Sequence, residues 1–169
     1  MNQDLEKYLN AFDLKPHPEG GYFKEIYRSE EQIPKGVFSE FDDNRNVCTG
    51  IYYLLSEKDK SHFHRIKSDE IWHFYKGTSN VNIHCIMKDG TYKLIKVGDN
   101  KDCLNFQIVI PKGVWFAAEL EENNEGNYAL CGCTVAPGFD FKDFEMAKKS
   151  ELLQKYPLHK NIIEIFTLE

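Results

Sequence analysis

The chain has 169 residues, 41% of them hydrophobic and 14% aromatic, which suits one domain with a buried core and argues against extended disorder. Its formal net charge of −6 argues against nucleic acids and anionic membranes as partners, because both attract concentrated positive charge. No apolar run reaches the roughly 20 residues of a membrane span, no signal-peptide pattern opens the chain, and the five cysteines form no regular framework, so a cytoplasmic location is expected.

The N-terminal part is predicted to contain one helix, one strand and a long loop. Residues 4–12 carry apolar side chains at helical spacing, and the proline- and glycine-rich residues 14–21 end that helix. Residues 22–28 then have the pattern of a strand. Residues 29–46 are polar and contain a proline and a glycine, which is typical of a loop that covers an opening.

The centre of the chain is predicted to be rich in β-strands. Short segments with β-branched and aromatic residues are separated by turn signals, among them Asp89-Gly90, which favours a tight hairpin. Regular spacing of this kind favours a sandwich or a closed barrel. The predicted strands are 47–55, 61–66, 70–75, 81–87, 92–97, 106–110, 114–120 and 128–135.

The C-terminal region changes to helical spacing. Apolar residues recur along one helix face between residues 144 and 156, with Asp143 as the predicted cap. The apolar residues 162–166 are expected to pack against the barrel or a partner chain. We find no repeat and no second domain, and we predict a single domain over 1–169 with a barrel core at about 20–136 and a helical segment at 140–169.

The segment from 61 to 77 carries the strongest functional pattern. His62 and His64 are one residue apart, so both point to the same face of a strand. Glu70 opens the next apolar run, and if the two strands pair, its carboxylate can reach the imidazoles. Imidazole and carboxylate groups that converge in an interior can ligate a metal or move protons.

These residues resemble the first motif of the cupin superfamily, in which two alternate histidines precede a glutamate and a glycine. His62, His64, Glu70 and Gly77 occur in this order, although five residues rather than three or four separate His64 from Glu70. The second cupin motif is matched in its first half by Pro111-Lys112-Gly113. Phe116 stands where that motif places its metal-binding histidine.

A narrower resemblance covers nearly the whole chain. Residues 16–23, 69–75 and 133–141 look like a family of small single-domain cupins described mainly as a domain of unknown function. The resemblance implies an all-β fold, the double-stranded β-helix or jelly-roll barrel, with a short N-terminal helix and a C-terminal helical tail. It also implies that two chains commonly pair into a homodimer, and it says little about reaction, because such barrels host many chemistries.

A metal-dependent function is one hypothesis. His62, His64 and Glu70 could form the open site of two histidines and one carboxylate that binds iron, and zinc, manganese and nickel are also considered. The apolar ring of Phe116 in place of the fourth ligand would crowd that site. No metal or other cofactor is therefore the first expectation.

Acid–base chemistry without a metal is the preferred hypothesis. His64 would act as the base, with Glu70 as its orienting partner or as the acid. Tyr52 or Tyr22 could donate a hydrogen bond to a developing oxyanion. The alternative is that His64 and Glu70 form a satisfied buried pair that only specifies packing.

The remaining candidates are expected to line a ligand pocket. Trp72 shares the strand face of Glu70, and Phe116 is expected to point into the barrel. His17 and Glu19 lie in a stiff proline-bounded segment that could close the barrel mouth, although an ordinary helix-to-strand turn explains them equally well.

The pattern as a whole predicts a cupin that binds a small molecule, most plausibly a carbohydrate derivative such as a sugar phosphate or a nucleotide sugar. If the protein is an enzyme, isomerisation or epimerisation through the His/Glu pair is the first hypothesis. A metal-dependent oxygenase or isomerase that uses a His/His/Glu site is the second hypothesis. A non-catalytic ligand-binding or sensor protein is the third.

Overall fold

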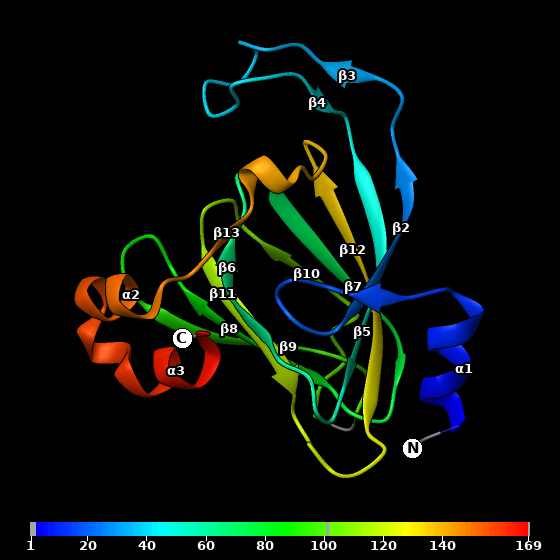
Figure 1. The fold of residues 1–169 in the computed structure, drawn as a ribbon. Helices are drawn as coiled ribbons and strands as arrows, with labels where there is room; N and C mark the ends of the chain where they lie inside the picture. Colours follow the sequence, from blue (N-terminus) through cyan, green and yellow to red (C-terminus); the bar gives the residue numbers. More distant parts are fainter. Residues whose placement is uncertain (1–2, 101, 169) are drawn as a thin grey trace.

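The computed structural model describes residues 3–100 and 102–168, in which two antiparallel sheets face one another around a closed interior (Figure 1). The larger sheet has six strands, namely, in order, β1 (Lys15–Pro16), β2 (Tyr22–Arg28), β5 (Thr49–Ser56), β12 (Tyr128–Ala136), β7 (Asp69–Gly77) and β10 (Gln107–Ile110). The smaller sheet has five strands, namely, in order, β13 (Glu145–Met146), β6 (Ser61–Arg65), β11 (Trp115–Leu120), β8 (Val81–Ile86) and β9 (Tyr92–Val97).

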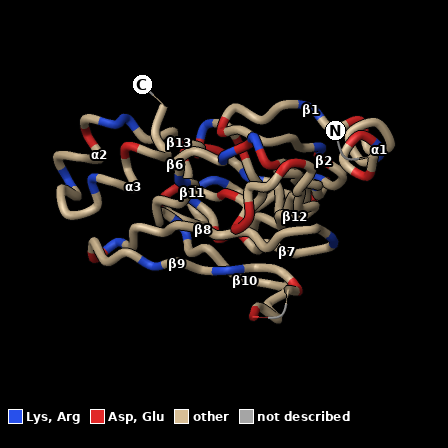
Figure 2. Tube along the Cα trace, turned by 90° about the horizontal axis from the view of Figure 1, so that it is seen from below, with Lys and Arg blue, Asp and Glu red and all other residues tan. Residues whose placement is uncertain are grey.

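Helices lie outside the two sheets. Helix α1 (Gln3–Ala11) lies beside the larger sheet, whereas α2 (Lys149–Lys155) and α3 (Lys160–Phe166) lie on the other side of the molecule, beside the smaller sheet (Figure 2). Two 3-10 helices, η1 (Phe141–Asp143) and η2 (Pro157–His159), precede α2 and α3. Throughout the described residues, no helix combines the length and apolar character that a membrane crossing requires.

Alternation of side chains along the strands builds the interior of the barrel. On β7, Trp72 and Phe74 are buried between the sheets, whereas Tyr75 is exposed on the outer face. On β11, Phe116 belongs to the interior and its neighbour Trp115 packs on the opposite face. These orientations follow from the two-residue period of a strand, and they agree with the predicted parity of both segments.

Two further apolar clusters attach the helices to the outer faces of the sheets. Phe166 of α3 and Leu152 of α2 pack against Phe63, which points outward from β6. Leu5 of α1 packs against Leu54 on the outer face of the larger sheet. Each fully buried side chain of this size contributes roughly 1.5–3 kcal/mol, so α1, α2 and α3 are held firmly on the barrel. The apolar residues predicted to pack against the barrel do so through α3.

The C-terminal helix begins later than the sequence predicts. Asp143 is not a helix cap, because its carboxylate is buried in an ion pair with Arg45. Residues 145–146 form β13 against the edge of β6, and α2 starts only at Lys149. Spacing alone cannot separate these cases, because Phe144 lines the cavity, Met146 pairs with β6 and Ala147 is buried against the helices, which together imitate a helix face.

The two motif strands, β6 and β7, do not pair with each other, so the condition for direct contact along one sheet is not met. Strand β6 pairs with β11 and β13, and β7 pairs with β12 and β10, so His64 and Glu70 belong to different sheets. Residues 66–68 carry the chain from one sheet to the other. His64 and Glu70 therefore approach the interior from opposite walls.

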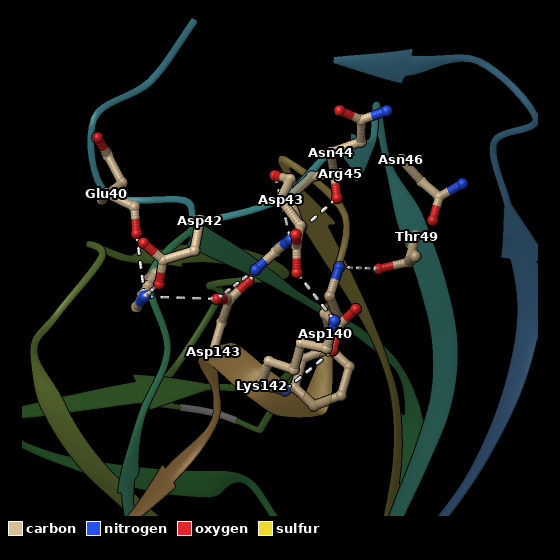
Figure 3. Close-up of polar contacts among 12 residues, drawn as sticks. Glu40, Asp42, Asp43, Asn44, Arg45, Asn46, Thr49, Asp140, Lys142 and Asp143 are labelled. Atoms are coloured by element: carbon tan, nitrogen blue, oxygen red, sulfur yellow. Dashed lines mark hydrogen bonds and ion pairs between the residues drawn. The ribbon is translucent and has the colours of Figure 1, made fainter. Parts of the chain in front are cut away.

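A long excursion between β2 and β5 projects beyond the end of the barrel and contains the short hairpin of β3 (Gln32–Ile33) and β4 (Arg45–Asn46) (Figure 1). We call residues 29–48 the arm. Its anchor is Arg45, whose Nε and Nη2 donate to the two carboxylate oxygens of Asp143 at 2.6 and 2.8 Å (Figure 3). Both side chains are 4% exposed, so this is a buried, bidentate ion pair.

Candidate functional site

The interior of the barrel contains a cavity of about 280 Å³, at the end of the barrel from which the arm leaves. Its walls come from the segment before β2, from β2, β5, β6, β7 and β12, and from the residues after β12. The polar side chains of the wall are His17, Glu19, Glu25, Arg28, Thr49, His64, Glu70 and Asp140. The aromatic side chains of the wall are Phe23, Tyr53, Phe139, Phe141 and Phe144.

The segment 17–21 forms a tight loop that places Glu19 in the cavity. The His17 N–H donates to the Gly21 carbonyl at 3.0 Å, and the His62 N–H donates to the Glu19 carbonyl at 2.8 Å. Gly20 has a φ of +112°, and a Cβ atom there would lie 2.0 Å from the Lys60 carbonyl oxygen. Only glycine therefore permits this close approach of the loop to the start of β6.

The carboxylate of Glu19 lies between two imidazole rings. Its Oε2 is 3.2 Å from Nε2 of His64 and 3.3 Å from Nδ1 of His17. Its Oε1 accepts a hydrogen bond of 2.9 Å from the Ser61 hydroxyl. Glu19 is 6% exposed and His64 is 2% exposed, so the group is nearly shielded from water.

The hydrogen bonds around these rings direct Nε2 of His64 toward the carboxyl group of Glu19. His64 Nδ1 donates to the His62 carbonyl at 2.7 Å, which leaves Nε2 facing the Glu19 carboxyl group. His17 Nδ1 accepts from the Glu19 N–H at 3.3 Å, and burial lowers the pKa of His17, so this ring is neutral. At 3.2 Å, Nε2 of His64 and Oε2 of Glu19 are therefore close enough to form a hydrogen bond.

Glu70 lines the same cavity, and its surroundings favour the protonated carboxyl group. Burial and, secondarily, the negative charge of Glu19 raise the pKa of Glu70 to about 8. At neutral pH the Glu70 carboxyl group is therefore mostly protonated and can donate a proton. Beside it, burial raises the pKa of the Cys133 thiol well above its ordinary value, so Cys133 is not an activated thiolate.

The only cationic side chain on the wall of the cavity, within residues 3–100 and 102–168, is already fully engaged. Arg28 donates to both carboxylate oxygens of Glu25 at 2.9 and 2.7 Å. It also donates to Asn46 Oδ1 at 2.9 Å and to the Phe139 carbonyl at 3.1 Å. Arg28 thus stabilises the rim of the cavity, and with Glu25 and Asp140 nearby the rim is not a site for an anion.

Three predicted residues lie next to the cavity but do not line it. The ring centroids of Phe116 and His64 are 4.1 Å apart, so Phe116 packs against the His64 ring without lining the cavity. Trp72 packs edge-on against Tyr53, with ring centroids 5.4 Å apart, and its Nε1 has no hydrogen-bond partner among the described residues. His62 is held by its Nδ1, which lies 2.7 Å from the Glu19 carbonyl oxygen.

The two tyrosines considered as oxyanion donors lie elsewhere. Tyr52 points to the outer face of the larger sheet and stacks on Phe12 at 4.6 Å between ring centroids. Tyr22 packs in the same outer cluster beneath α1. Neither side chain lines the cavity, because the alternate residues of β2 and β5, such as Phe23 and Tyr53, face the interior.

The sequence did not predict that several residues line the cavity, notably Tyr53, Cys133 and the phenylalanines at 139, 141 and 144. The local signal was the run Gly138-Phe139-Asp140-Phe141, whose alternate aromatic residues follow a strand directly. That pattern is equally typical of core packing, so it could not indicate a cavity rim by itself.

The predicted metal ligands do not form a metal site. His64 and Glu70 line the cavity from opposite sheets, whereas His62 is bound to the loop backbone beside it. In the part of the chain that the structure describes, no group of three or more His, Cys, Asp or Glu side chains is arranged to hold a metal ion. We therefore derive no reaction step through a metal.

The fold and the position of the cavity identify the class of protein. Two facing sheets of this topology, with the site inside, define a jelly-roll barrel of the cupin type. The family model described as "Cupin superfamily (DUF985)" matches residues 6–147, so the chain belongs to this family. The predicted family and fold class are thereby confirmed.

Two relatives are similar to this protein over most of its length. The uncharacterized protein YML079W of Saccharomyces cerevisiae is 35% identical over 159 residues, covering 89% of this chain and 78% of the yeast protein. A solved hypothetical protein from Leishmania major is 31% identical, with a TM-score of 0.87 over 97% of this chain and 98% of its own. Oxalate decarboxylase from Bacillus subtilis shares the fold alone, with 12% identity and a TM-score of 0.54 over 89% of this chain and 36% of its own.

Proposed function

We propose that this cupin catalyses proton transfer on a small carbohydrate derivative bound in the cavity, as in the isomerisation or epimerisation of a carbon next to a carbonyl group. One observation carries the proposal. In a buried pair, Nε2 of His64 lies 3.2 Å from Oε2 of Glu19, and the mostly protonated carboxyl group of Glu70 lines the same cavity from the opposite sheet. A base and an acid with different affinities for protons are what such a reaction needs.

The chemistry assigns a role to each group. When Nε2 of His64 carries no proton, it can remove a proton from the carbon next to the carbonyl group. Glu70 donates its proton to the carbonyl oxygen, which gives a neutral enediol rather than a charged enolate. The pair then returns the proton to the neighbouring carbon, or, once the enediol has turned over in the cavity, to the opposite face of the same carbon. Glu70 regains a proton from the hydroxyl group of the enediol that becomes the new carbonyl group.

The walls of the cavity favour an uncharged ring. At about 280 Å³ the cavity is near the lower end of the range for small-molecule sites, so it suits a single sugar ring and not a whole nucleotide sugar. Phe139, Phe141 and Phe144 present apolar surfaces on which the C–H groups of such a ring can pack. The negative charges of Glu25 and Asp140 at the rim oppose entry of an anionic group.

Solvent exchange tests the proposal. A panel of aldoses, ketoses and their monophosphates is incubated with the protein in deuterium oxide, and proton NMR follows loss of the signal next to the carbonyl group. We expect exchange in at least one compound, slowed about 10²- to 10⁴-fold by His64→Gln, because a general base contributes a factor of this size. The matched control is His73→Gln, since His73 lies on the outer face of β7 and bonds Thr134.

Two results would contradict the proposal. Equal exchange by the wild-type protein and the His64→Gln variant would remove His64 from the mechanism. Saturable binding of a compound without any exchange would leave the cavity as the site of a non-catalytic binding protein.

A further inference from the structure

A second hollow lies directly beside the cavity. This groove has a volume of about 510 Å³ and is more open than the cavity. It shares two wall residues with the cavity, Ile66 and Phe144. A molecule that occupies the cavity could therefore extend past the Phe144 ring into the groove without leaving the surface of the protein.

The groove has the opposite electrostatic character to the cavity. Five cationic side chains line it against three carboxylates, an excess of two positive charges in a chain whose net charge is −6. The cations come from separate segments of the chain, which converge at this end of the barrel. They are Arg65, Lys67, Lys88, Lys112 and Lys142, and the carboxylates are those of Glu40, Asp143 and Glu145.

The carboxylates of the groove are neutralised from within the protein. Nε and Nη2 of the buried Arg45 donate to the Asp143 carboxylate, so the negative charge of Asp143 is compensated within the protein (Figure 3). Glu145 is paired with Arg65 at 2.6 Å, and Glu40 is paired with Lys112. These contacts leave part of the positive charge of the groove available to a ligand.

Two lysines remain available for an added anion. Lys88 is exposed and makes no hydrogen bond or ion pair within the described residues. Lys67 donates to the Glu40 carbonyl at 3.0 Å, and its nearest carboxylate oxygen, on Asp143, is 3.7 Å away. An anion between these side chains would satisfy both ammonium groups at little cost in existing contacts.

We propose that this groove binds the phosphate group of a phosphorylated ligand whose ring occupies the cavity. The inference rests on the proposed function, because it assigns the second part of the same substrate. It resolves the conflict between an acidic rim and an anionic substrate: the uncharged ring enters the acidic cavity, and the phosphate group remains in the basic groove. The ligand class is then a sugar phosphate, attached through a carbon remote from the reacting carbonyl group.

Calorimetric titration tests the groove without requiring turnover. The probes are inorganic phosphate and a hexose monophosphate, and the variants are Lys88→Glu, Lys88→Arg and the control Lys76→Glu. Lys76 is an exposed lysine of β7 that does not line the groove, so it supplies the same change of net charge. We expect Lys88→Glu to weaken both probes about tenfold or more, while Lys88→Arg and Lys76→Glu stay within about twofold of wild type.

The outcomes separate the groove from the catalytic proposal. Equal weakening by Lys88→Glu and Lys76→Glu, or no saturable phosphate binding to the wild-type protein, would overturn the groove as a phosphate site. Binding of the hexose monophosphate no tighter than that of phosphate would overturn the link between groove and cavity. His64→Gln should leave phosphate affinity unchanged, so loss of proton exchange and loss of phosphate binding report on different parts of the site.

Discussion

The Glu70 side chain couples the cavity to the stability of the whole fold. In the unfolded chain its carboxyl group ionises near pH 4.5, whereas in the folded protein burial and the charge of Glu19 raise its pKa to about 8. Between these values the folded state holds a proton that the unfolded state has released. The contribution of Glu70 to the free energy of unfolding is therefore fully present below about pH 4.5 and is lost as the pH rises to about 8.

Replacement by the neutral isostere should remove this pH dependence. We expect Glu70→Gln to match the wild-type protein at pH 5 and to be more stable by a few kcal/mol at pH 8.5, because the variant has no charge to bury. Guanidinium denaturation at both pH values measures the difference, and Glu125→Gln, at an exposed loop position, is the matched control. Parallel pH curves for wild type and Glu70→Gln would contradict the assignment.

At the residue scale, the sequence indicated His64 and Glu70 but not the contact between His64 and Glu19. His64 and Glu70 could be predicted because polar side chains at inward strand positions need partners. The partner of His64 is Glu19, which precedes it by 45 positions and arrives through a folded-back loop. Which loop closes over which strand is a tertiary contact, and no local periodicity encodes it.

At the scale of elements, a buried ion pair connects the arm to the rim of the cavity. Arg45 and Asp143 are separated by 98 positions, and they connect the arm to η1 at the rim of the cavity. Removal of one partner leaves the other charge buried without compensation. The same contact therefore supports the arm and holds the segment that carries Phe141 and Phe144.

We expect Arg45→Met to lower the free energy of unfolding by about 3–5 kcal/mol, the usual result of breaking a buried pair. Urea denaturation followed by circular dichroism provides the measurement. The control is Lys142→Met, which removes an exposed pair with Asp43 and should leave the free energy of unfolding nearly unchanged. Similar losses in the two variants would show that burial of the Arg45 pair has no special weight.

The strands were the easiest elements to predict, and the region after residue 140 was the hardest. Alternation and turn residues place β2 exactly where residues 22–28 predict it and the other long strands within about two residues. Between 141 and 147 the chain instead forms η1 and β13, because Phe144 turns into the cavity and the following backbone pairs with β6. The pairing of β13 requires that β6 have a free edge in the folded sheet, and the sequence alone does not show which strand edges are free.

At the scale of the whole molecule, the expected homodimer stays a prediction. The outer face of the larger sheet leaves apolar side chains exposed, with Tyr75 and Val109 each more than half accessible. Both lie on neighbouring strands of the same face, β7 and β10. A second copy of the chain could cover this face, since continuous apolar surface is typical of contact sites.

Light scattering after size exclusion tests this expectation. We expect a mass twice the 19.7 kDa of one chain for the wild-type protein and a single-chain mass for Val109→Lys. The matched control is Leu158→Lys. Leu158 is an apolar residue that is 93% exposed, and it lies on η2 rather than on the larger sheet. A single-chain mass for wild type at every concentration would refute the dimer.

Residues 17–28 and residues 139–144 come from opposite parts of the chain, and both line the mouth of the cavity. The first segment also supplies Glu19, the partner of His64, so it belongs to the reactive group as well as to the entrance. Residues 139–141 contribute only to the lining, whereas His64 and Glu70 stand on the barrel strands. Relatives that keep Glu19, His64 and Glu70 and differ at 139–141 should perform one chemistry on dissimilar molecules.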